Sequence, residues 1–237
     1  NRHPYKEWVS QNRRTLPHQD WKKETQLDEK DLLRQQTAFG FTSEDFELVI
    51  NNMAAEGKEP TYCMGDDIPL AVLSSKPHIL FNYFQQRFAQ VTNPPIDPLR
   101  EKLVMSLEMH LGERGSPLVP REKEAKVLHI NSPILNEAEL NYLTKNGIKS
   151  KTISTLLTLT NRPDSFAEGI NKLCLASENA VKEGNRIVIL SDRGVCADKT
   201  YIPPLLAIGA VHHHLLNKGL RLKASLIIDT AQCWSTH

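Results

Sequence analysis

Four short apolar runs in the second half of the sequence each end in polar residues whose types suit ligand binding. These ends are Asn131-Ser132-Pro133, Asn161-Arg162-Pro163-Asp164, Ser191-Asp192-Arg193-Gly194 and Asp229-Thr230. Ligands of parallel β/α units collect at the carboxyl ends of the strands. One interpretation therefore makes Arg162 and Arg193 anchors for an anion, with Asp192 and Asp229 as a base or as metal ligands. In the other, Asn, Asp, Ser, Pro and Gly only form the turns that join strand to helix. The sequence contains neither GxGxxG nor GxxxxGK, and this favours the turn interpretation.

The triplet His212-His213-His214 raises the possibility of a metal site. It falls in a predicted helix over residues 204–218, where successive side chains project about 100° apart. Three consecutive histidines therefore do not converge on one ion, and no neighbouring residue supplies a helical i,i+3 or i,i+4 ligand pair. We expect the triplet to be structural.

The four cysteines, Cys63, Cys174, Cys196 and Cys233, are widely spaced and form no CxxC pair. This spacing disfavours a zinc ribbon or a thioredoxin-like site, so we expect mostly structural, reduced thiols. Cys196 lies in a predicted loop where a thiolate could be activated, but the sequence around it supplies no base.

The stretch Met64-Gly65-Asp66-Asp67-Ile68-Pro69 is unusual because it combines two adjacent carboxylates with Gly and Pro. Two adjacent carboxylates could serve acid–base chemistry. A turn in which the carboxylates cap backbone amides is the other interpretation, and composition does not choose between the two.

Composition excludes several classes of partner. The 237 residues include 29 basic and 28 acidic ones, which gives a formal net charge of +1. Such a balance argues against nucleic acid or an anionic membrane as the main partner. No apolar run approaches the ~18–20 residues of a membrane span, and residues 1–20 lack the apolar core of a signal peptide. We expect a protein of the cytoplasm or the plastid stroma.

The periodicity predicts three successive regions. Residues 1–40 are polar with scattered aromatics and indicate a connecting arm that stays outside the core. Residues 41–237 indicate one α/β domain, mainly helical over 41–115 and built of β/α units over 116–237. In the helical part we expect helices from Thr42 to Gly57, over 77–91, and from Asp97 through Leu107.

The second half alternates apolar strands with helices. The predicted strands are 127–130, 153–160, 187–190 and 226–228, and the predicted helices are 136–145, 165–183 and 204–218. Ser165 and Glu168 form the pattern of a capping box, and Gly184 is a natural helix end. Strands spaced in this way with helical crossovers predict an α/β fold of parallel β/α units. Whether the sheet is open or closed does not follow from the pattern.

Several long strings resemble the central domain of glutamate synthases. They are Met64-Gly-Asp-Asp-Ile-Pro-Leu-Ala-Val-Leu-Ser74, Phe88-Ala-Gln-Val-Thr-Asn-Pro-Pro-Ile-Asp-Pro-Leu-Arg-Glu101, Leu190-Ser-Asp-Arg-Gly194 and Ile202-Pro-Pro-Leu-Leu-Ala-Ile-Gly-Ala-Val-His-His-His214. The resemblance covers nearly the whole chain, including Pro4-Tyr-Lys-Glu-Trp8. The ending, from Ala224 to His237, is more similar to the ferredoxin-dependent branch than to the NADPH-dependent one.

The resemblance implies a connecting role rather than a catalytic one. In this family an amidotransferase domain hydrolyses glutamine, ammonia passes through an internal channel, and an FMN-binding barrel with an iron–sulfur cluster forms glutamate from 2-oxoglutarate. The resemblance places no catalytic, FMN or cluster residue in this chain, so no catalytic, cofactor or metal residue is assigned and no cofactor is expected here. The implied partners are the amidotransferase and FMN-binding domains of the same polypeptide, with ferredoxin only through the parent enzyme.

Two loops are candidates for contacts with those domains. They contain Met64, Gly65, Asp66 and Asp67 in one loop, and Asn93, Pro94, Pro95 and Asp97 in the other. Both are rigid turn sequences, and adjacent carboxylates are costly to bury unless a partner satisfies them. The alternative for the two loops is that their carboxylates only cap local turns. The alternative for the whole chain is a stand-alone α/β enzyme or small-anion binder that uses the strand-end loops.

Overall fold

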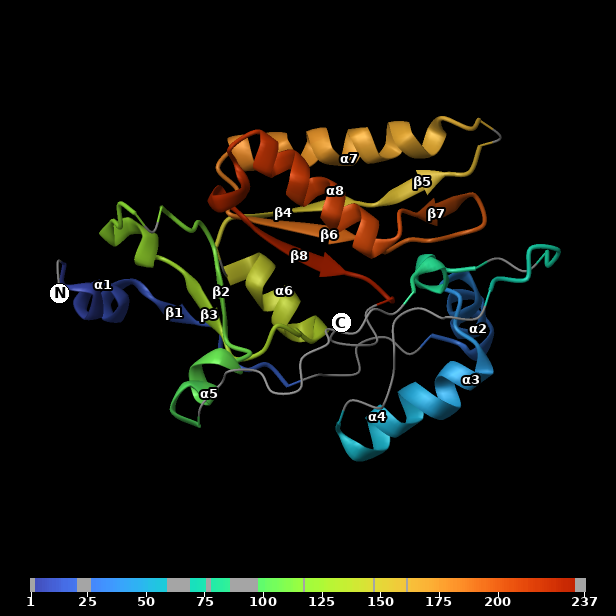
Figure 1. Cartoon of the computed structure of the whole chain (residues 1–237), viewed down its shortest axis with the longest axis horizontal. Helices are drawn as coiled ribbons and strands as arrows, with labels where there is room; N and C mark the ends of the chain where they lie inside the picture. Colours follow the sequence, from blue (N-terminus) through green and yellow to red (C-terminus); the bar gives the residue numbers. More distant parts are fainter. Residues whose placement is uncertain are drawn as a thin grey trace. The chain divides into compact units, whose positions relative to one another are not determined.

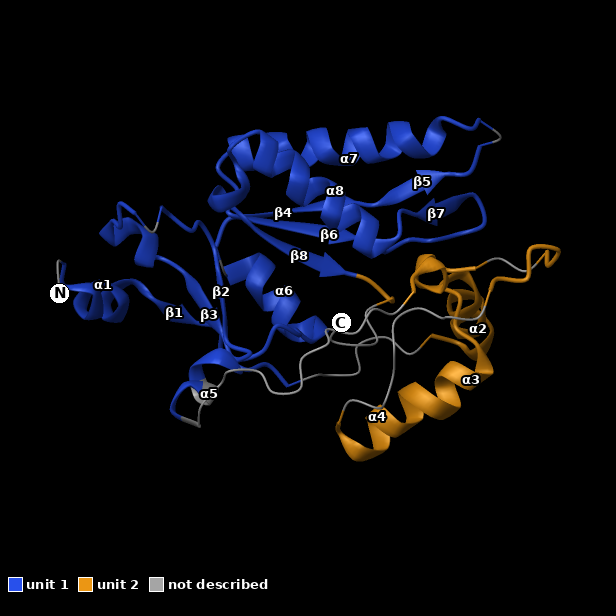
Figure 2. Ribbon diagram, in the orientation of Figure 1, with its two compact units in different colours: residues 1–24, 96–229 blue, residues 25–95, 230–237 orange. Residues whose placement is uncertain are grey.

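The computed structural model describes residues 3–20, 27–58, 69–75, 78–85, 98–116, 118–146, 148–160 and 162–232 (Figure 1). The chain forms two compact units, which Figure 2 distinguishes by colour. Unit 1 comprises residues 1–24 and 96–229, and unit 2 comprises residues 25–95 and 230–237. The two units are described separately.

The centre of unit 1 is a parallel sheet of three strands in the order β4-β6-β8. β4 spans Ser150–Ser154, β6 spans Ile187–Ser191 and β8 spans Ser225–Asp229. β6 lies in the middle and is buried along its whole length. A central strand of a parallel sheet is covered on both faces, which explains why β6 is almost continuously apolar. The predicted parallel β/α arrangement is confirmed for these strands.

Three helices cover the two faces of this sheet (Figure 1). α7 (Ser165–Lys182) and α8 (Pro204–Asn217) pack on one face, where the side chains of Val188 and Leu190 meet them. α6 (Glu137–Asn146) packs on the other face against Ile187 and Ile189. Successive side chains of a strand point to opposite faces, so one apolar run supplies both cores. All three predicted helices of this half are confirmed within two residues at each end, and Gly184 ends α7 with a φ of 85°.

A second small sheet extends the core around α6. Its order is β1-β3-β2, with β1 at Arg14–Thr15, β3 at Leu128–Ile130 and β2 at Met109–Leu111. β1 is parallel to β3, and β2 is antiparallel to it. A separate antiparallel pair joins β5 (Leu156–Thr158) to β7 (Lys199–Tyr201).

The prediction that the first 40 residues stay outside the core is wrong for Leu16 and Phe39, which are both buried. The amides of Arg14 and Leu16 donate to the carbonyls of Val127 and His129 at 3.1 and 2.9 Å, and Leu16 lies in the core beside α6. Before this strand, α1 spans Tyr5–Asn12 and contains no buried residue. A strand of two residues has no readable period, and its pairing partner lies more than a hundred positions away, so the pattern alone does not reveal it.

Unit 2 contains helical segments. α2 spans Glu29–Ala38, and a continuous helical stretch follows as α3 (Ser43–Asp45), the π-helix η1 (Phe46–Ile50) and α4 (Asn51–Glu56). Thr42 and Asp45 form a reciprocal capping box, and Gly57 closes the stretch with a φ of 63°. The predicted helix from Thr42 to Gly57 is therefore confirmed, although only Val49 of the expected apolar stripe is buried.

Two other predictions need correction, and two short turns were not predicted. Within the described part of 77–91 there is only the short 3-10 helix η2 (Leu80–Tyr83), because the Asn82 side chain accepts from the Ile79 amide and Phe84 is extended. α5 (Pro98–Val104) ends before Leu107. Two further 3-10 turns, η3 (Glu122–Ala125) and η4 (Arg221–Lys223), were not predicted.

The predicted strand over 153–160 divides at Thr155. The amide and hydroxyl of Thr155 both donate to the carbonyl of Ser191, which ends the pairing of β4 with β6. The predicted capping box of α7 is also wrong. The Ser165 hydroxyl donates to the Arg162 carbonyl, and the Glu168 carboxylate pairs with the Arg162 guanidinium, so neither caps the helix.

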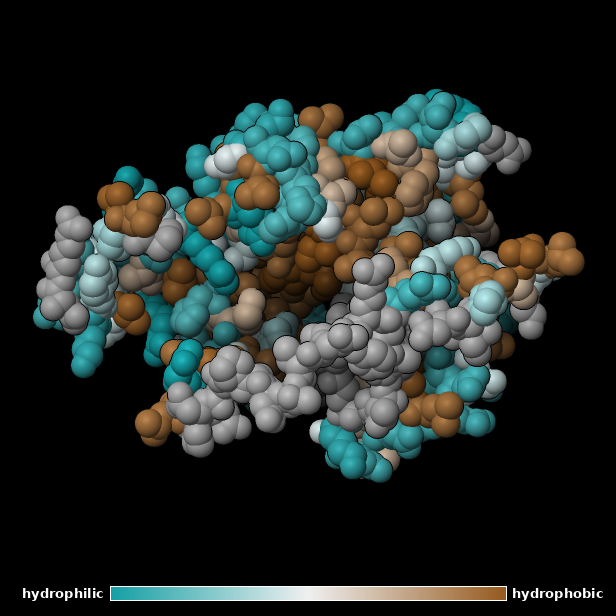
Figure 3. All heavy atoms as spheres, in the orientation of Figure 1, coloured by the Kyte–Doolittle hydropathy of each residue, from teal (hydrophilic) through white to brown (hydrophobic). Residues whose placement is uncertain are grey.

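On the face drawn in Figure 3, hydrophilic residues gather over the outer surface of α7. None of the helices in the described parts of the chain is long and apolar enough to cross a bilayer.

Candidate functional site

The carboxyl ends of β6 and β8 hold a hydrogen-bonded group of charged side chains. Oδ2 of Asp229 accepts from the Ser191 hydroxyl at 2.9 Å and from Nε of Arg193 at 2.7 Å. The amide of the buried Asp192 donates to the Asp229 carbonyl at 3.2 Å. The structure therefore brings together Ser191, Asp192, Arg193 and Asp229, as the strand-end pattern predicts.

A second carboxylate completes this group from the first turn of α6. Arg193 donates from its terminal guanidinium nitrogen to Oε1 of Glu137 at 2.9 Å. The hydrogen bond to Asp229 is the main reason why the pKa of Arg193 is raised above its ordinary value. One guanidinium faces two carboxylates, so Arg193 closes an ion-pair network and is not an open anchor for an anion. We call Ser191, Arg193, Asp229 and Glu137 the carboxyl-edge network.

Arg162, the other predicted anchor, does not join this group. It pairs with Glu168 at 2.6 Å on the surface, where both side chains are substantially exposed. An exposed pair of this kind contributes only ~0–1 kcal/mol to stability. Both arginines of the anion interpretation thus have carboxylate partners within unit 1, and the geometry favours the turn interpretation.

The acidic residues of the first turn of α6 were not predicted to take part in the site. Oδ1 of Asn136 accepts from the Glu139 amide at 2.8 Å, and the Asn136 amide donates to the Glu139 carboxylate at 3.0 Å. This is a reciprocal cap, and the spacing Asn136-x-x-Glu139 ahead of an apolar segment is its sequence signal. The cap fixes the turn from which Glu137 reaches Arg193.

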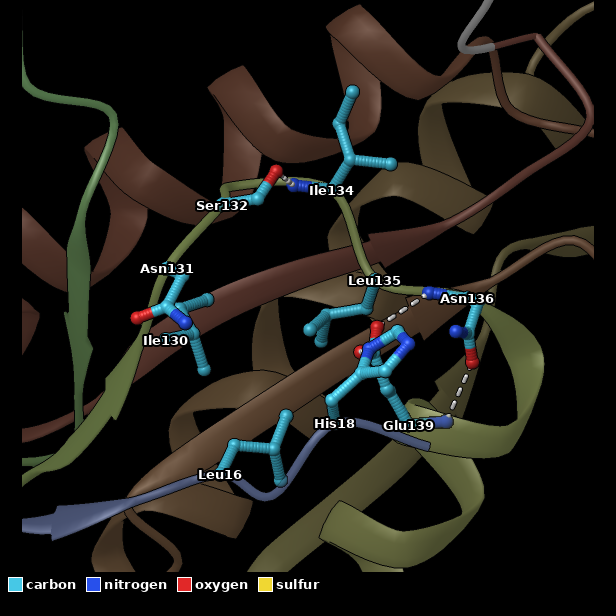
Figure 4. Close-up of a pocket in the computed structure, with 9 residues that line it drawn as sticks. All are labelled: Leu16, His18, Ile130, Asn131, Ser132, Ile134, Leu135, Asn136 and Glu139. Carbon is cyan, nitrogen blue, oxygen red and sulfur yellow. Dashed lines mark hydrogen bonds and ion pairs between the residues drawn. The ribbon is translucent and has the colours of Figure 1, made fainter. Parts of the chain in front are cut away.

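A pocket of about 380 Å³ lies between β1, β3 and this turn of α6 (Figure 4). Its apolar lining includes Leu16, Ile130 and Leu135, and its polar groups include His18 and Glu139. Figure 4 shows the His18 ring over the Glu139 carboxylate, and Nδ1 lies 3.0 Å from Oε1. Glu139 already accepts from His18 and from the α6 cap, so its oxygens are committed to local contacts.

The histidine triplet is held by three different contacts. Nδ1 of His212 accepts from Nε of Arg221 at 2.9 Å, and the His213 ring lies edge-on to the His212 ring. Nε2 of His214 donates to Oε2 of Glu178 in α7 at 2.6 Å. The rings therefore do not converge, and the part of the chain that the structure describes contains no cluster of three His, Cys, Asp or Glu suited to a metal. The partner of His214 comes from another helix, so the local spacing could not reveal it.

Two of the four cysteines lie in the described residues. Cys174 is buried, and this burial raises the pKa of its thiol. The Cys196 thiol is exposed and donates to the Asp198 carboxylate at 2.9 Å, a contact that lowers the pKa of Asp198. An accepting carboxylate is not the cationic neighbour that activates a thiolate.

The predicted contact loops lie outside the described residues. They are Met64, Gly65, Asp66 and Asp67, and Asn93, Pro94, Pro95 and Asp97. Their assignment as contacts with other domains stays a prediction.

The fold of unit 1 defines an α/β protein in which the strand-end side chains of Ser191, Arg193 and Asp229 are joined by hydrogen bonds. Residues 34–237 match the glutamate synthase central domain. The chain belongs to this family.

The similar proteins are ferredoxin-dependent glutamate synthases. The chain is 51% identical to the ferredoxin-dependent glutamate synthase of Pyropia yezoensis over 236 aligned residues. The alignment covers 99% of this chain and 15% of that protein. It is 50% identical over 248 residues to ferredoxin-dependent glutamate synthase 2 of Synechocystis, covering 100% of this chain and 15% of the relative. It is 50% identical over 238 residues to the chloroplastic ferredoxin-dependent glutamate synthase 2 of Arabidopsis thaliana. This alignment covers 99% of this chain and 15% of the relative. The chain thus spans about one seventh of the length of these relatives.

Proposed function

We propose that the chain acts as the non-catalytic connecting domain of a ferredoxin-dependent glutamate synthase. It joins a glutamine amidotransferase domain to an FMN-binding synthase domain and helps to shape the path of ammonia between them. The observation that carries this proposal is the coverage: almost the whole chain aligns with only 15% of each relative. The rest of such a protein supplies the amidotransferase, the synthase and the contact with ferredoxin.

The surface of unit 1 supports a role inside a larger polypeptide. Leu99 and Leu103 of α5 are 94% and 82% exposed, and the apolar side chains of Met105 and Leu107 just beyond it are also exposed. Several exposed large apolar side chains close together in the sequence accord with a face that another domain covers.

The cofactors of the proposed reaction belong to the parent enzyme outside this chain. FMN needs a phosphate-binding loop or a barrel site, and an iron–sulfur cluster needs closely spaced thiolates. The sequence has neither a phosphate-loop motif nor a CxxC pair, and Cys174 lies in the α7–α8 core. These features support the proposal that FMN and the iron–sulfur cluster bind elsewhere in the parent enzyme.

We further propose the cytoplasm or the plastid stroma as the location, with no nucleic acid or membrane as partner. The Arabidopsis and rice relatives are named as chloroplastic. The near-zero net charge of +1 accords with the absence of a polyanionic partner.

The proposal is tested in the full-length enzyme by comparing glutamine hydrolysed with glutamate formed. Asp67→Ala is expected to leave glutaminase activity and ammonia-dependent glutamate synthesis intact but to raise the ratio of glutamine consumed to glutamate formed. The matched control is Asp28→Ala, because Asp28 caps α2 locally by accepting from the Asp31 amide at 2.7 Å. Equal ratios in both variants and the wild type would count against a coupling role for the Asp66–Asp67 loop.

A further inference from the structure

The first turn of α6 is bonded to both segments through which the chain leaves unit 1 for unit 2. The chain passes from unit 1 to unit 2 after residue 24 and again after residue 229. It approaches the first of these points through residues 16–20, which follow β1, and the second through β8, which ends at Asp229. The contacts of the α6 turn with both segments lie within unit 1.

Asn136 holds the segment that follows β1. Its side-chain nitrogen Nδ2 donates to the Gln19 carbonyl at 2.9 Å, while its Oδ1 caps α6 by accepting from the Glu139 amide. Glu139 adds a second contact, since its Oε1 lies 3.0 Å from Nδ1 of His18 (Figure 4). The segment after β1 is therefore tied to the cap of α6 by two side chains.

Glu137, the next residue, holds the end of β8 through one arginine. Oε1 of Glu137 accepts from a terminal nitrogen of Arg193 at 2.9 Å, and Nε of the same guanidinium donates to Oδ2 of Asp229 at 2.7 Å. The Asp229 side chain is only 16% exposed, so water and salt screen this pair less than a surface pair. A guanidinium is planar and presents its donors in a fixed fork, so a shift of either carboxylate bends or breaks one of the two bonds.

Two adjacent residues thus hold two segments that are far apart in the sequence. Asn136 and Glu137 share one peptide unit, which is planar and does not rotate freely. The reciprocal cap between Asn136 and Glu139 fixes the turn in which both residues lie. A displacement of one segment therefore moves this turn or breaks a hydrogen bond. Contiguous hydrogen bonds and a rigid helical turn are the kind of network through which energetic coupling passes between two sites.

We propose that the first turn of α6 couples the two segments, so that loosening either one loosens the other. The alternative is that each contact only stabilises its own turn, as the exposed pair Arg162–Glu168 does at the start of α7. The relevance of this coupling to a connecting domain rests on the proposed function: a change at one connection to unit 2 would reach the other through α6.

Glu168 offers a matched control. Like Glu137, it is an acidic residue in the first turn of a helix and pairs with one arginine. The two carboxylate side chains are similarly exposed, 45% for Glu168 and 42% for Glu137. The difference is that Arg193 continues to Asp229, whereas Arg162 pairs with Glu168 at the surface.

Hydrogen exchange in the full-length protein, resolved to single amides by mass spectrometry, measures the coupling. Two backbone amides report on the two segments. The Leu16 amide donates to the His129 carbonyl at 2.9 Å, and the Asp192 amide donates to the Asp229 carbonyl at 3.2 Å. Amides in the centre of β6, which is buried along its whole length, report on global unfolding.

Two single variants cut the network on either side of the turn. Glu137→Ala removes the link to β8. Asn136→Ser removes the link to Gln19, because a serine hydroxyl still caps the helix but is too short to replace the amide donor. Each variant is expected to speed exchange about threefold or more at both Leu16 and Asp192, relative to the centre of β6. Glu168→Ala is expected to leave both amides unchanged.

The double variant shows whether the two contacts act as one unit. Its effect should be smaller than the product of the two single effects, because either change already releases the turn. Faster exchange only at the amide nearest to each change would overturn the proposal, as would no change or an equal increase that includes β6. An effect of Glu168→Ala equal to that of Glu137→Ala would also overturn it. The test reads no enzymatic activity, so its failure is distinct from failure of the connecting role.

Discussion

Glu178 of α7 and His214 of α8 are joined by a contact of 2.6 Å between Oε2 and Nε2. Lys182, one turn further along α7, donates to the other carboxylate oxygen at 2.5 Å. Glu178 is 6% exposed, so these two donors satisfy a buried carboxylate and connect the two helices that cover the central sheet. The triplet that resembles a metal site in the sequence therefore contributes to helix packing.

The first prediction concerns pH. The hydrogen bond from Lys182, followed by that from His214, lowers the pKa of Glu178 from 4.5 to about 2. A carboxyl group whose pKa is lower in the folded state stabilises the fold above its unfolded pKa, and the contribution is lost as the pH falls from about 4.5 towards 2. Glu178→Gln should lower Tm at pH 7 and flatten the fall in Tm over this acidic range. A Tm profile parallel to that of the wild type would contradict the assignment.

The second prediction separates His214 from its neighbour. His214→Gln should lower Tm because it weakens the contact with Glu178, whereas His213→Gln, at an exposed position, should leave Tm unchanged. Neither variant should change metal content or the glutamate-forming activity of the full-length enzyme. Loss of that activity at unchanged Tm would show that the triplet has a direct functional role.

The third prediction concerns the carboxyl-edge network. Arg193→Ala leaves the largely buried Asp229 without its guanidinium partner and should lower the free energy of unfolding by ~1–2 kcal/mol. Arg162→Ala removes an exposed pair and should cost less than Arg193→Ala, at most ~1 kcal/mol. Urea unfolding measures both values, and equal costs would mean that the network does not stabilise the strand ends.

The fourth prediction concerns the start of the chain. The amides of Arg14 and Leu16 should exchange slowly with solvent because they donate to carbonyls beside and within β3. Residues of α1, which has no buried member, should exchange faster. Leu16→Ala should cost about 2 kcal/mol or more because it opens a cavity beside α6. Exchange at Leu16 as fast as in α1 would contradict the core position of this segment.

The sequence predicts the α/β half of the fold well because strong local signals coincide there. β6 is an apolar run, α7 has a regular apolar face, and Gly184 supplies the required positive φ. The short strands β1 and β2 were missed, since two or three residues show no period and their pairing with β3 is a long-range property. The division of residues 150–158 into two strands depends on Thr155, whose partner Ser191 lies in another strand.

The candidate site was predictable in part. The polar residues at the predicted strand ends correctly predict that Ser191, Arg193 and Asp229 lie together, because parallel strands end at one edge of the sheet. The pairing of Arg193 with Glu137 was not predictable, because the two residues are brought together only by the packing of α6 on the sheet. The pairing of His214 with Glu178 has the same origin, the packing of α7 on α8.

The proposed connecting role requires a protected path for ammonia between two reactions. The most direct measurement supplies the full-length enzyme with glutamine labelled with heavy nitrogen in its amide, together with an excess of unlabelled ammonium. The wild type and Asp28→Ala should form glutamate that retains the label, whereas Asp67→Ala should form glutamate diluted by ammonium from solution. Undiluted label in Asp67→Ala, or equal dilution in all three proteins, would contradict a role of this chain in keeping the path closed.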